Sequence, residues 1–507
     1  MTEHVRFGRK IQDMPAELEF GSWGTLEISA ALDVFTDSLA YFDREDVRKA
    51  EQGRLEMILA ARRYHEGNHV KPLKVEPGEH DDNILMNLCR SLIDDSVSWL
   101  FGNPETGILQ ITSDDGEEIN PVIPETYERS GGFLFFKRLG VRGGIAGHGF
   151  VKLIQDPNGD TRVVALDPQL VSVRVEEMDT SQVLAYKIEW RRVEVETDPG
   201  TRRKDTFIYR QLVVNASTSQ EPAWVIADFK SKERARRDWN LINGPFAWPW
   251  AWSPIHDCPN IEAGWGHYGL SDLEDVTGLN DALNFVVSNT LRIIKIHAHP
   301  KTMGTGFTAG DVQETAVDSF WTIENPEAKI YNLEMQSDLA SSLAVIDLVR
   351  TAFWTIGRGL DLSVYKDKIG QITNFALRVL SIRAQHKMGD KRLTYGKMLR
   401  NINSHILEMT GQEAAETVIV WPKPLPEDPK ETTAELQTEV AMGVVSRQTA
   451  SEELGRDWAT EQERMRQESK EQATLGQYLM DQFDRGGQNN QEVSNGRDRP
   501  ESNSQDG

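Results

Sequence analysis

Apolar positions recur at spacings of three and four residues along several parts of the chain, which is the period of an amphipathic helix. The first such stretch covers residues 27–66 and has Gly67 at its end. A second covers about 83–100 and stops before Gly102 and Pro104. Both segments are predicted to be helices that pack one face against a core.

Between about residues 106 and 242 the pattern changes to short runs rich in β-branched and aromatic residues. Examples are FLFFKR, FVKLIQD, TRVVALD, LVSVRVEE and AWVIADF, and the turn sequence DPNGD at 156–160 separates two of them. Runs of this kind predict a mixed or antiparallel β region. The Trp- and Pro-rich stretch at 243–269 follows. Its prolines exclude a regular helix, so we expect an irregular crossover there.

The longest helical pattern covers residues 271–296. Ser271 and Glu274 have the spacing of a capping box, and Pro300 stands just past the far end. About 26 residues at a rise of 1.5 Å give a helix about 39 Å long, which is long for a globular protein. The pattern therefore predicts a long strut that begins at Ser271.

A second helical pattern covers residues 337–356, and the residues between the two helices are partly strand-like. A polar loop at 359–371 leads to a third helix over about 372–409, in which Gly389 and Gly396 predict a bend. The sequence thus predicts two long helices that carry a small insert at one end and join a larger body at the other.

The last part of the chain is charged and helical in pattern from about residue 429 to about 480. Residues 481–507 lack apolar anchors and are expected to be disordered. No internal repeat is visible.

Composition narrows the class of protein. A chain of 507 residues exceeds one hydrophobic core, so about two to four domains are expected. The net charge of −23 argues against ordinary nucleic-acid binding, which depends on Lys and Arg contacts to phosphate. Cys89 and Cys258 lie far apart and predict two free thiols rather than a metal framework. No uninterrupted apolar run of 18 residues and no apolar leader segment are seen, so neither a membrane span nor a secretory signal is expected.

Candidate metal chemistry is sparse. The Gly-rich sequence GGIAGHG at 143–149 has the wrong spacing for a dinucleotide site and lies between strand-like segments, so we interpret it as flexible turn backbone. His297 and His299 would need further ligands to hold a metal. His267 and His256 are possible donors, but no carboxylate or thiol is arranged with them. We therefore predict no metal site.

Candidate catalytic chemistry is equally weak. His256, Asp257 and Cys258 are adjacent, and neighbouring side chains on an extended chain point apart. The sequence contains neither the phosphate-binding pattern GxxxxGK[ST] nor the nucleophile pattern GxSxG. We predict no catalytic site, no cofactor and no enzymatic activity.

Four segments, in order along the chain, resemble the portal proteins of tailed bacteriophages of the siphophage type. The first is RRYHEGNH followed by NLCRSLIDDSVSWLFGNP, and the second is HYGLSDLEDVTGLNDALN. The third is GQITNFALRVLSIRAQHKM, and the fourth is PLPEDPKETTAELQTEVAMGVVSRQTASEELG. No single segment is diagnostic, but their order over about residues 25–470 is a fairly specific signal.

The resemblance implies an α+β portal fold, with long stem helices, a β-rich wing, a small α/β clip and a helical crown, assembled as a ring. The parts would be an N-terminal arm (1–24), the wing (25–260), a connector with the first stem helix (261–296), the clip (297–336), the second stem helix (337–358), the tunnel loop (359–371), a long wing helix (372–405), the crown (406–480) and a disordered tail (481–507).

The resemblance also implies where function-bearing residues would lie. In the tunnel loop, Lys366 and Lys368 would contact DNA phosphates or would simply be solvated, with Asp361 and Tyr365 beside them. The clip residues that would face partners are His299, Lys301, Phe307, Phe320 and Trp321. The stem residues singled out are Asp272, Asp275, Asn284 and Arg292.

The implied partners follow from the same resemblance. They are further copies of the chain in a ring of about twelve, double-stranded DNA bound transiently and without sequence preference, the terminase large subunit, the head-tail adaptor and the major capsid protein, with a scaffold protein as a further candidate. The expected location is the portal vertex of the virion, and the host cytoplasm during assembly. Two alternatives stay open: another acidic virion protein without a DNA channel, and an enzyme that uses the Gly-rich 140–149 segment.

Overall fold

The structure is a computed structural model, and it divides the chain into two compact units, Met1–Pro424 and Leu425–Gly507. Its fold is a mixture of helices and strands, which confirms the α+β class in this coarse form. The described residues are 5–7, 17–19, 25–75, 77–78, 81–105, 107–113, 119–156, 158–198, 201–217, 223–233, 238–298, 302–305, 329–332, 339–361, 374–413, 415–423 and 429–470.

The N-terminal helical pattern forms two helices instead of one. α1 covers Ile28–Asp43 and α2 covers Glu45–His65, because Arg44 between them has extended backbone angles (φ −59°, ψ 142°). The next helix, α3, covers Leu88–Phe101 and begins later than its apolar pattern predicts. The Asn87 side chain caps it by accepting a hydrogen bond from the N–H of Arg90 at 3.0 Å.

A six-stranded sheet lies under α1. Its order is β1-β13-β12-β11-β10-β9, and every neighbouring pair is antiparallel except β1 with β13. Phe35 and Phe42 of α1 pack on Val225 and Phe229 of the sheet, which forms one of two hydrophobic cores. The strands are β1 (Val5–Phe7), β9 (Val171–Val175), β10 (Val183–Asp198), β11 (Thr201–Asn215), β12 (Trp224–Lys232) and β13 (Trp239–Trp248).

The second core contains two helices that the sequence does not predict. The prediction of a strand at FLFFKR is wrong, because these residues begin α5 (Phe133–Ala146), which follows α4 (Val122–Arg129). Phe135, Phe136 and Leu139 repeat at helical spacing and are buried together with residues of α3. Tertiary packing therefore overrides the local β propensity of this run. α5 leads into a three-stranded sheet of order β14-β7-β8, with β14 at Ile255–Pro259, β7 at His148–Gln155 and β8 at Thr161–Ala165.

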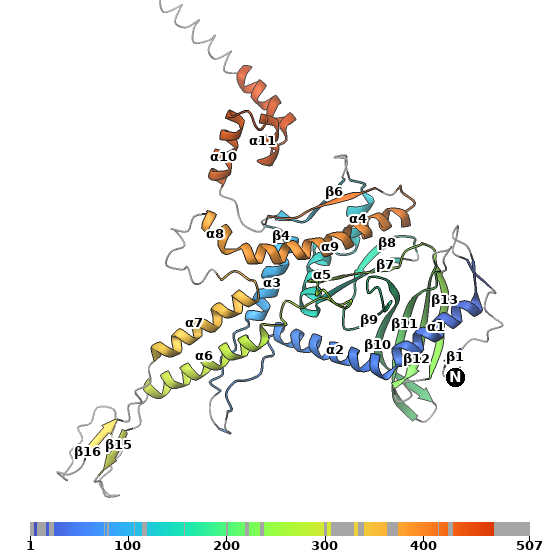
Figure 1. Cartoon of the computed structure of the whole chain (residues 1–507), viewed down its shortest axis with the longest axis horizontal. Helices are drawn as coiled ribbons and strands as arrows, with labels where there is room; N and C mark the ends of the chain where they lie inside the picture. The colour runs from blue at the N-terminus through green and yellow to red at the C-terminus, as the bar shows by residue number, and fades with distance from the viewer. Residues whose placement is uncertain are drawn as a thin grey trace, which may run out of the picture. The chain divides into compact units, whose positions relative to one another are not determined.

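Two long helices continue the chain. α6 covers Thr277–Ala298 and α7 covers Leu339–Ile356, and they lie side by side (Figure 1). The antiparallel strands β15 (Thr302–Thr305) and β16 (Lys329–Asn332) lie between them in sequence and beyond their ends in space (Figure 1). The predicted start of the first helix at Ser271 is wrong, since residues 272–276 form turns.

The third long helical segment consists of α8 (Asn374–Leu380) and α9 (Ile382–Met409). The interruption is at Ser381, and α9 continues as one helix through Gly389 and Gly396, so a bend at these two residues stays a prediction. A Cβ atom placed on Gly389 would have no neighbouring atom within 4 Å. Gly396 lies beside the Trp421 side chain. α9 contributes many buried residues to the second core, including Tyr395, Leu399 and Ile402.

Six short strands in three pairs also belong to the first unit. β17 (Thr417–Val420) pairs with β6 (Gln110–Ser113), β2 (Glu17–Glu19) pairs with β3 (Thr25–Glu27), and β4 (Gly102–Asn103) pairs with β5 (Gly107–Ile108). The second unit contains α10 (Pro429–Ala441), α11 (Arg447–Glu453) and helical backbone at 458–470, which agrees with the predicted charged helical region. The predicted disordered tail at 481–507 lies outside the described residues.

Candidate functional site

A buried cluster of charges lies where the chain enters α6. The Asp272 carboxylate is fully buried, with Oδ1 3.0 Å from Lys387 Nζ and Oδ2 2.5 Å from Lys391 Nζ. Lys391 also donates to Ser96 Oγ at 2.7 Å, and Lys387 donates to the Gly357 carbonyl at 2.9 Å. The cluster therefore joins α3, the turn at 272–276, the end of α7 and α9 through one carboxylate.

The lysines determine the charge state of this cluster. Burial alone would raise the pKa of Asp272, but Lys387 and Lys391 lower it to about 2. Burial lowers the pKa of Lys391 to about 8, although Asp272 opposes this effect. Asp272 is therefore ionised at neutral pH, and its negative charge compensates the buried ammonium groups.

The Gly-rich run 143–149 makes room for the turn that carries Asp272. A side chain at Gly144 would come within 2.9 Å of Asp272 Oδ2, and one at Gly143 would overlap the Tyr395 hydroxyl. The N–H of Asp272 donates to the Gly144 carbonyl at 2.9 Å. The interpretation of this run as flexible turn backbone is wrong, because residues 143–146 end α5 in close contact with α9 and the turn.

Ser271 does not act as the predicted helix cap. Its hydroxyl lies 3.0 Å from the Gly144 carbonyl and 2.8 Å from the Ile145 carbonyl, and it accepts from the N–H of Leu273. Through these hydrogen bonds the Ser271 hydroxyl connects the turn to the end of α5. The helix consequently begins six residues later, at Thr277.

A row of polar residues along α6 holds an extended segment of chain. Asn280, Asn284 and Ser288 are fully buried and spaced four residues apart. They accept hydrogen bonds from three alternate backbone N–H groups: Leu88 to Asn280 at 3.2 Å, Met86 to Asn284 at 2.8 Å, and Ile84 to Ser288 at 2.9 Å.

The geometry of this polar ladder follows from two repeats. Four helical residues rise about 6.0 Å, and two extended residues advance about 6.6 Å. The two spacings agree closely enough for three successive bonds. The ladder therefore fixes residues 84–88 against α6 without a β-strand partner.

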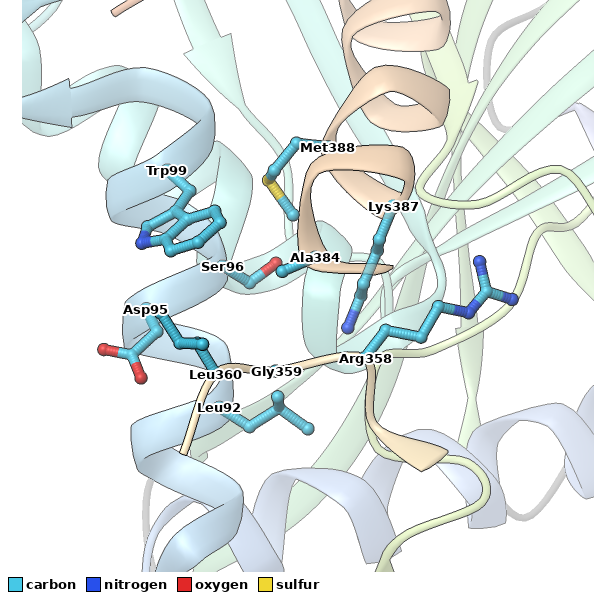
Figure 2. A pocket seen from close by; sticks show the side chains of 10 residues that line it. All are labelled: Leu92, Asp95, Ser96, Trp99, Arg358, Gly359, Leu360, Ala384, Lys387 and Met388. Carbon is cyan, nitrogen blue, oxygen red and sulfur yellow. The ribbon is translucent and has the colours of Figure 1, made fainter. Parts of the chain in front are cut away.

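The end of α7 is a sharp reversal that opens into a small cavity. Arg358 has φ 52°, a left-handed conformation that favours glycine, and the N–H of Gly359 bonds to the Trp354 carbonyl at 2.9 Å. Figure 2 shows α3 and α9 on two sides of the cavity, with the chain from Arg358 to Leu360 crossing it. The cavity volume is about 150 Å³. The lining side chains include Leu92, Ser96, Trp99, Lys387 and Met388.

The predicted tunnel-loop residues are described only at their first member. Asp361 Oδ2 lies 3.2 Å from Nε of Arg350 on α7, so this carboxylate is paired with the helix that precedes it. Tyr365, Lys366 and Lys368 lie outside the described residues. The predicted clip residues His299, Lys301, Phe307, Phe320 and Trp321 also lie outside them.

The four predicted stem residues divide into two kinds. Asp272 and Asn284 are buried and hold neighbouring segments, as described above. Asp275 is exposed, and Arg292 is half-buried on α6. Lys387 and Lys391 were not predicted, although two lysines four residues apart among the apolar positions of a helix are a signal for a buried carboxylate partner.

α7 is apolar in composition, and more than half of its residues are exposed. By length and composition it could cross a membrane, and within the described residues it is the one helix that passes this test. Among its 18 residues Phe353 alone is buried. Leu343, Val345 and Leu348 are 56%, 41% and 68% exposed. On α6, Phe285, Leu291 and Ile294 are exposed as well.

One group of ligand-type side chains also lies close together. Donor atoms of His148, Asp257 and His267 are within 4.8 Å of one another. His148 is on β7, Asp257 is on β14, and His267 is in the segment that leads to the 272–276 turn.

Comparison with known proteins gives a family match over most of the chain. Residues 45–475 match the family described as "Phage portal protein, SPP1 Gp6-like". No curated protein matches.

Solved structures that are similar include the virion of a native gene transfer agent particle, with 11% identity over 79% of this chain and 93% of that chain, and a TM-score of 0.40. The neck of the native particle, computed with C12 symmetry, has 12% identity over 73% and 89% of the two chains and a TM-score of 0.39. The neck of the empty particle, computed with C6 symmetry, has 13% identity over 72% and 94% and a TM-score of 0.39.

Proposed function

Because this chain belongs to the SPP1 Gp6-like phage portal protein family, we propose that α6 and α7 form the stem of a ring in which neighbouring copies cover the apolar face of α7. A portal protein is located at one capsid vertex of the virion and is the conduit for DNA, and the family is structural. The predictions of a phage portal protein and of its place in the virion are thereby confirmed.

The uncovered surface of α7 is the single observation that carries this proposal. Exposed apolar area costs about 25 cal/mol per Å², and contiguous patches on soluble proteins mark interaction surfaces. α7 itself contains Asp347 and Arg350, and Arg350 pairs with Asp347 at 3.3 Å and with Asp361. Such a helix fits a surface between copies, where apolar positions are covered and a few paired charges remain at the rim.

Mass measurement and imaging of the purified chain test the ring. Twelve copies of 57.3 kDa give about 690 kDa, and end-on views should show a ring with a central hole. Binding to detergent micelles or lipid vesicles, with no ring in any condition, would contradict the proposal and favour a membrane role for α7. A closed particle without a hole would favour the alternative of a virion protein that lacks a channel.

We infer that the loop at 359–371 faces the DNA in this ring. The reversal at Arg358 and the Asp361–Arg350 pair support a loop that leaves the end of α7 in a defined direction. Lys366 and Lys368 would supply weak phosphate contacts in an otherwise acidic conduit. Replacing both with Glu should shorten the packaged DNA, and packaging of unchanged length would exclude this role.

The other predicted parts fit the same proposal. Residues 25–260 and α9 would form the wing, and the second unit would form most of the crown. The insert at 297–336 would be the clip, which docks the terminase motor and then the head-tail adaptor. The β15–β16 pair, placed beyond the ends of α6 and α7, supports an exposed docking element (Figure 1). A chain without residues 303–318 that still bound motor and adaptor would exclude the clip assignment.

A further inference from the structure

Three side chains of the first unit converge on the carboxylate of Asp257. His148 Nε2 lies 2.7 Å from Asp257 Oδ2, and His267 Nε2 lies 2.8 Å from the same oxygen. The Tyr186 hydroxyl donates to the other oxygen, Asp257 Oδ1. The side chains of His148 and Asp257 are 1% and 10% exposed, so the group is shielded from bulk water.

The fold places these residues together from three segments. β14 pairs antiparallel with β7, with Asp257 opposite Phe150 and Pro259 opposite His148, so His148 and Asp257 are diagonal neighbours in the sheet. Gly264 (φ 77°) and Gly266 (φ 72°) have left-handed backbones that return the chain towards the sheet. His267 follows directly and reaches Asp257 from this return.

The hydrogen bonds of His267 define the state of its ring. Nδ1 lies 3.1 Å from the Thr180 carbonyl, which can only accept, so Nδ1 carries a proton. In the neutral ring Nε2 then bears a lone pair that faces the carboxylate. Nε2 also lacks hydrogen-bond geometry to any group of the described residues, in spite of its 2.8 Å distance from Oδ2.

A lone pair beside a carboxylate oxygen is repulsive unless a proton on that nitrogen or a metal cation lies between them. A ring nitrogen whose partner N–H donates to a backbone carbonyl has the arrangement of a histidine that binds metal. Buried polar groups left unpaired in this way require a further group, such as an ion or a water.

We propose that His148, Asp257 and His267 bind one divalent transition-metal ion of the zinc type. Two imidazole nitrogens and one carboxylate oxygen are a common three-ligand set for Zn²⁺, with metal distances of about 2.0–2.2 Å. Binding requires the ligand atoms to separate slightly from their present contacts, to about 3.4 Å for tetrahedral geometry.

The fourth ligand would come from the adjoining cleft. The group borders a cleft of about 470 Å³ whose lining includes Asp257, His267 and Glu262. Glu262, which lines this cleft, or a water molecule would take the open position. The ion would then tie the segment before the 272–276 turn to the β7–β14 sheet, which is a structural role independent of ring assembly.

The test uses the untagged full-length chain, stripped of metal by a chelator and titrated with ZnCl₂. Calorimetry should show one tight site per chain, and Co²⁺ should give the visible absorption bands of a four-coordinate site. His267→Gln and Asp257→Asn should each weaken binding at least tenfold. His256→Gln is the matched control, because His256 lines the same cleft but bonds to His405 at 3.2 Å.

Two results would overturn the proposal. One is a wild-type chain that binds no Zn²⁺ stoichiometrically. The other is equal binding by His267→Gln and His256→Gln, which would place any bound ion elsewhere. Circular dichroism and particle mass are recorded for each variant. His267→Gln changes a side chain at the cleft rather than in the core, so a folding failure of the buried Asp257→Asn variant leaves the comparison intact.

Discussion

At the scale of single residues, the most demanding feature is the carboxylate of Asp272, buried between two lysines. Burying an ion pair costs a large desolvation free energy. Removing one partner is worse, because it leaves a buried charge without compensation. Ser96 and the Gly357 carbonyl provide further contacts for the ammonium groups. The cluster thus makes the position of four chain segments depend on one side chain.

Asp272→Asn should destabilise the chain by about 3–5 kcal/mol, because Lys387 and Lys391 would remain buried without a counter-charge. Asp275→Asn is the matched control, since Asp275 is exposed in the same turn and its replacement should cost less than about 0.5 kcal/mol. Urea unfolding at equal protein concentration measures both. Equal losses for the two variants would contradict the importance of the cluster.

The wild-type chain and the Asp272→Asn variant should also respond differently to acid. The pKa of Asp272 is lowered from 3.8 to about 2 in the folded chain, so the carboxylate stabilises the fold above about pH 4. This contribution, roughly 2 kcal/mol, disappears as the pH falls from about 4 through 2. The stability difference between wild type and Asp272→Asn should therefore shrink over that interval, as measured by unfolding at pH 5, 4, 3 and 2.

Sequence reasoning located some of these residues without identifying their roles. Asp272 and Asn284 were selected because they lie in a helix that resembles a portal stem, but their partners come from segments more than 100 residues away. A one-dimensional pattern cannot supply such pairings. The strand prediction for FLFFKR was wrong because it rested on the local β propensity of these residues. The packing of α5 on α3, which makes them helical, is a contact between segments distant in sequence.

At the scale of elements, the polar ladder of α6 shows why this helix could be predicted but its start could not. The apolar and polar positions of α6 repeat with the helical period, so the sequence predicts a helix there. Residues 271–276 have the sequence of a helix cap, but in the structure they lead into the helix through a turn. The Ser271 hydroxyl bonds to α5 instead of the helix end. Hydrogen bonds to a distant segment thus determine where α6 begins, and local sequence preference predicts a different residue.

Asn284→Ala should leave the N–H of Met86 without its acceptor, at a cost of about 1–3 kcal/mol for a buried donor. Asn289→Ala is the matched control, because Asn289 is exposed on the same helix. Hydrogen exchange followed at residues 84–88 should quicken in the first variant and stay unchanged in the second. Unchanged exchange in both would show that the ladder does not hold this segment.

At the scale of the whole molecule, the exposed side of α7 makes the single chain incomplete. A helix of this composition is stable in water when a second surface covers it. The sequence predicted the two long helices and the insert between them, and the resemblance supplied the ring. The exposure of apolar residues on α7 then adds an independent reason for the chains to associate. Sequence periodicity alone could not give this reason, because an apolar helix face in a core and one at an interface have the same pattern.

Leu343→Asp combined with Leu348→Asp should prevent assembly, because both side chains are more than half exposed on the proposed interface and would place charges in it. The variant should remain folded, since neither side chain contributes to either core. Met178→Asp, at a position that is 95% exposed outside the helices, is the control and should still form the ring. Mass photometry separates about 57 kDa from the assembled particle, and a ring of the double variant would disprove this interface.

The polar ladder also has a mechanical consequence. Its last bond is at Ser288, and α6 continues to Ala298, about 15 Å further. Beyond Ser288 the helix contacts the chain just before residues 84–88 through the Lys295–Asp82 ion pair at 2.9 Å and packs on α7, so a sideways load at the β15–β16 end would bend α6 and α7 together, with the ladder as the fulcrum and the Asp272 cluster beyond it. If a motor docks at that end as proposed, its torque would reach α3 and α9 as a rotation of their common anchor, the Asp272 cluster.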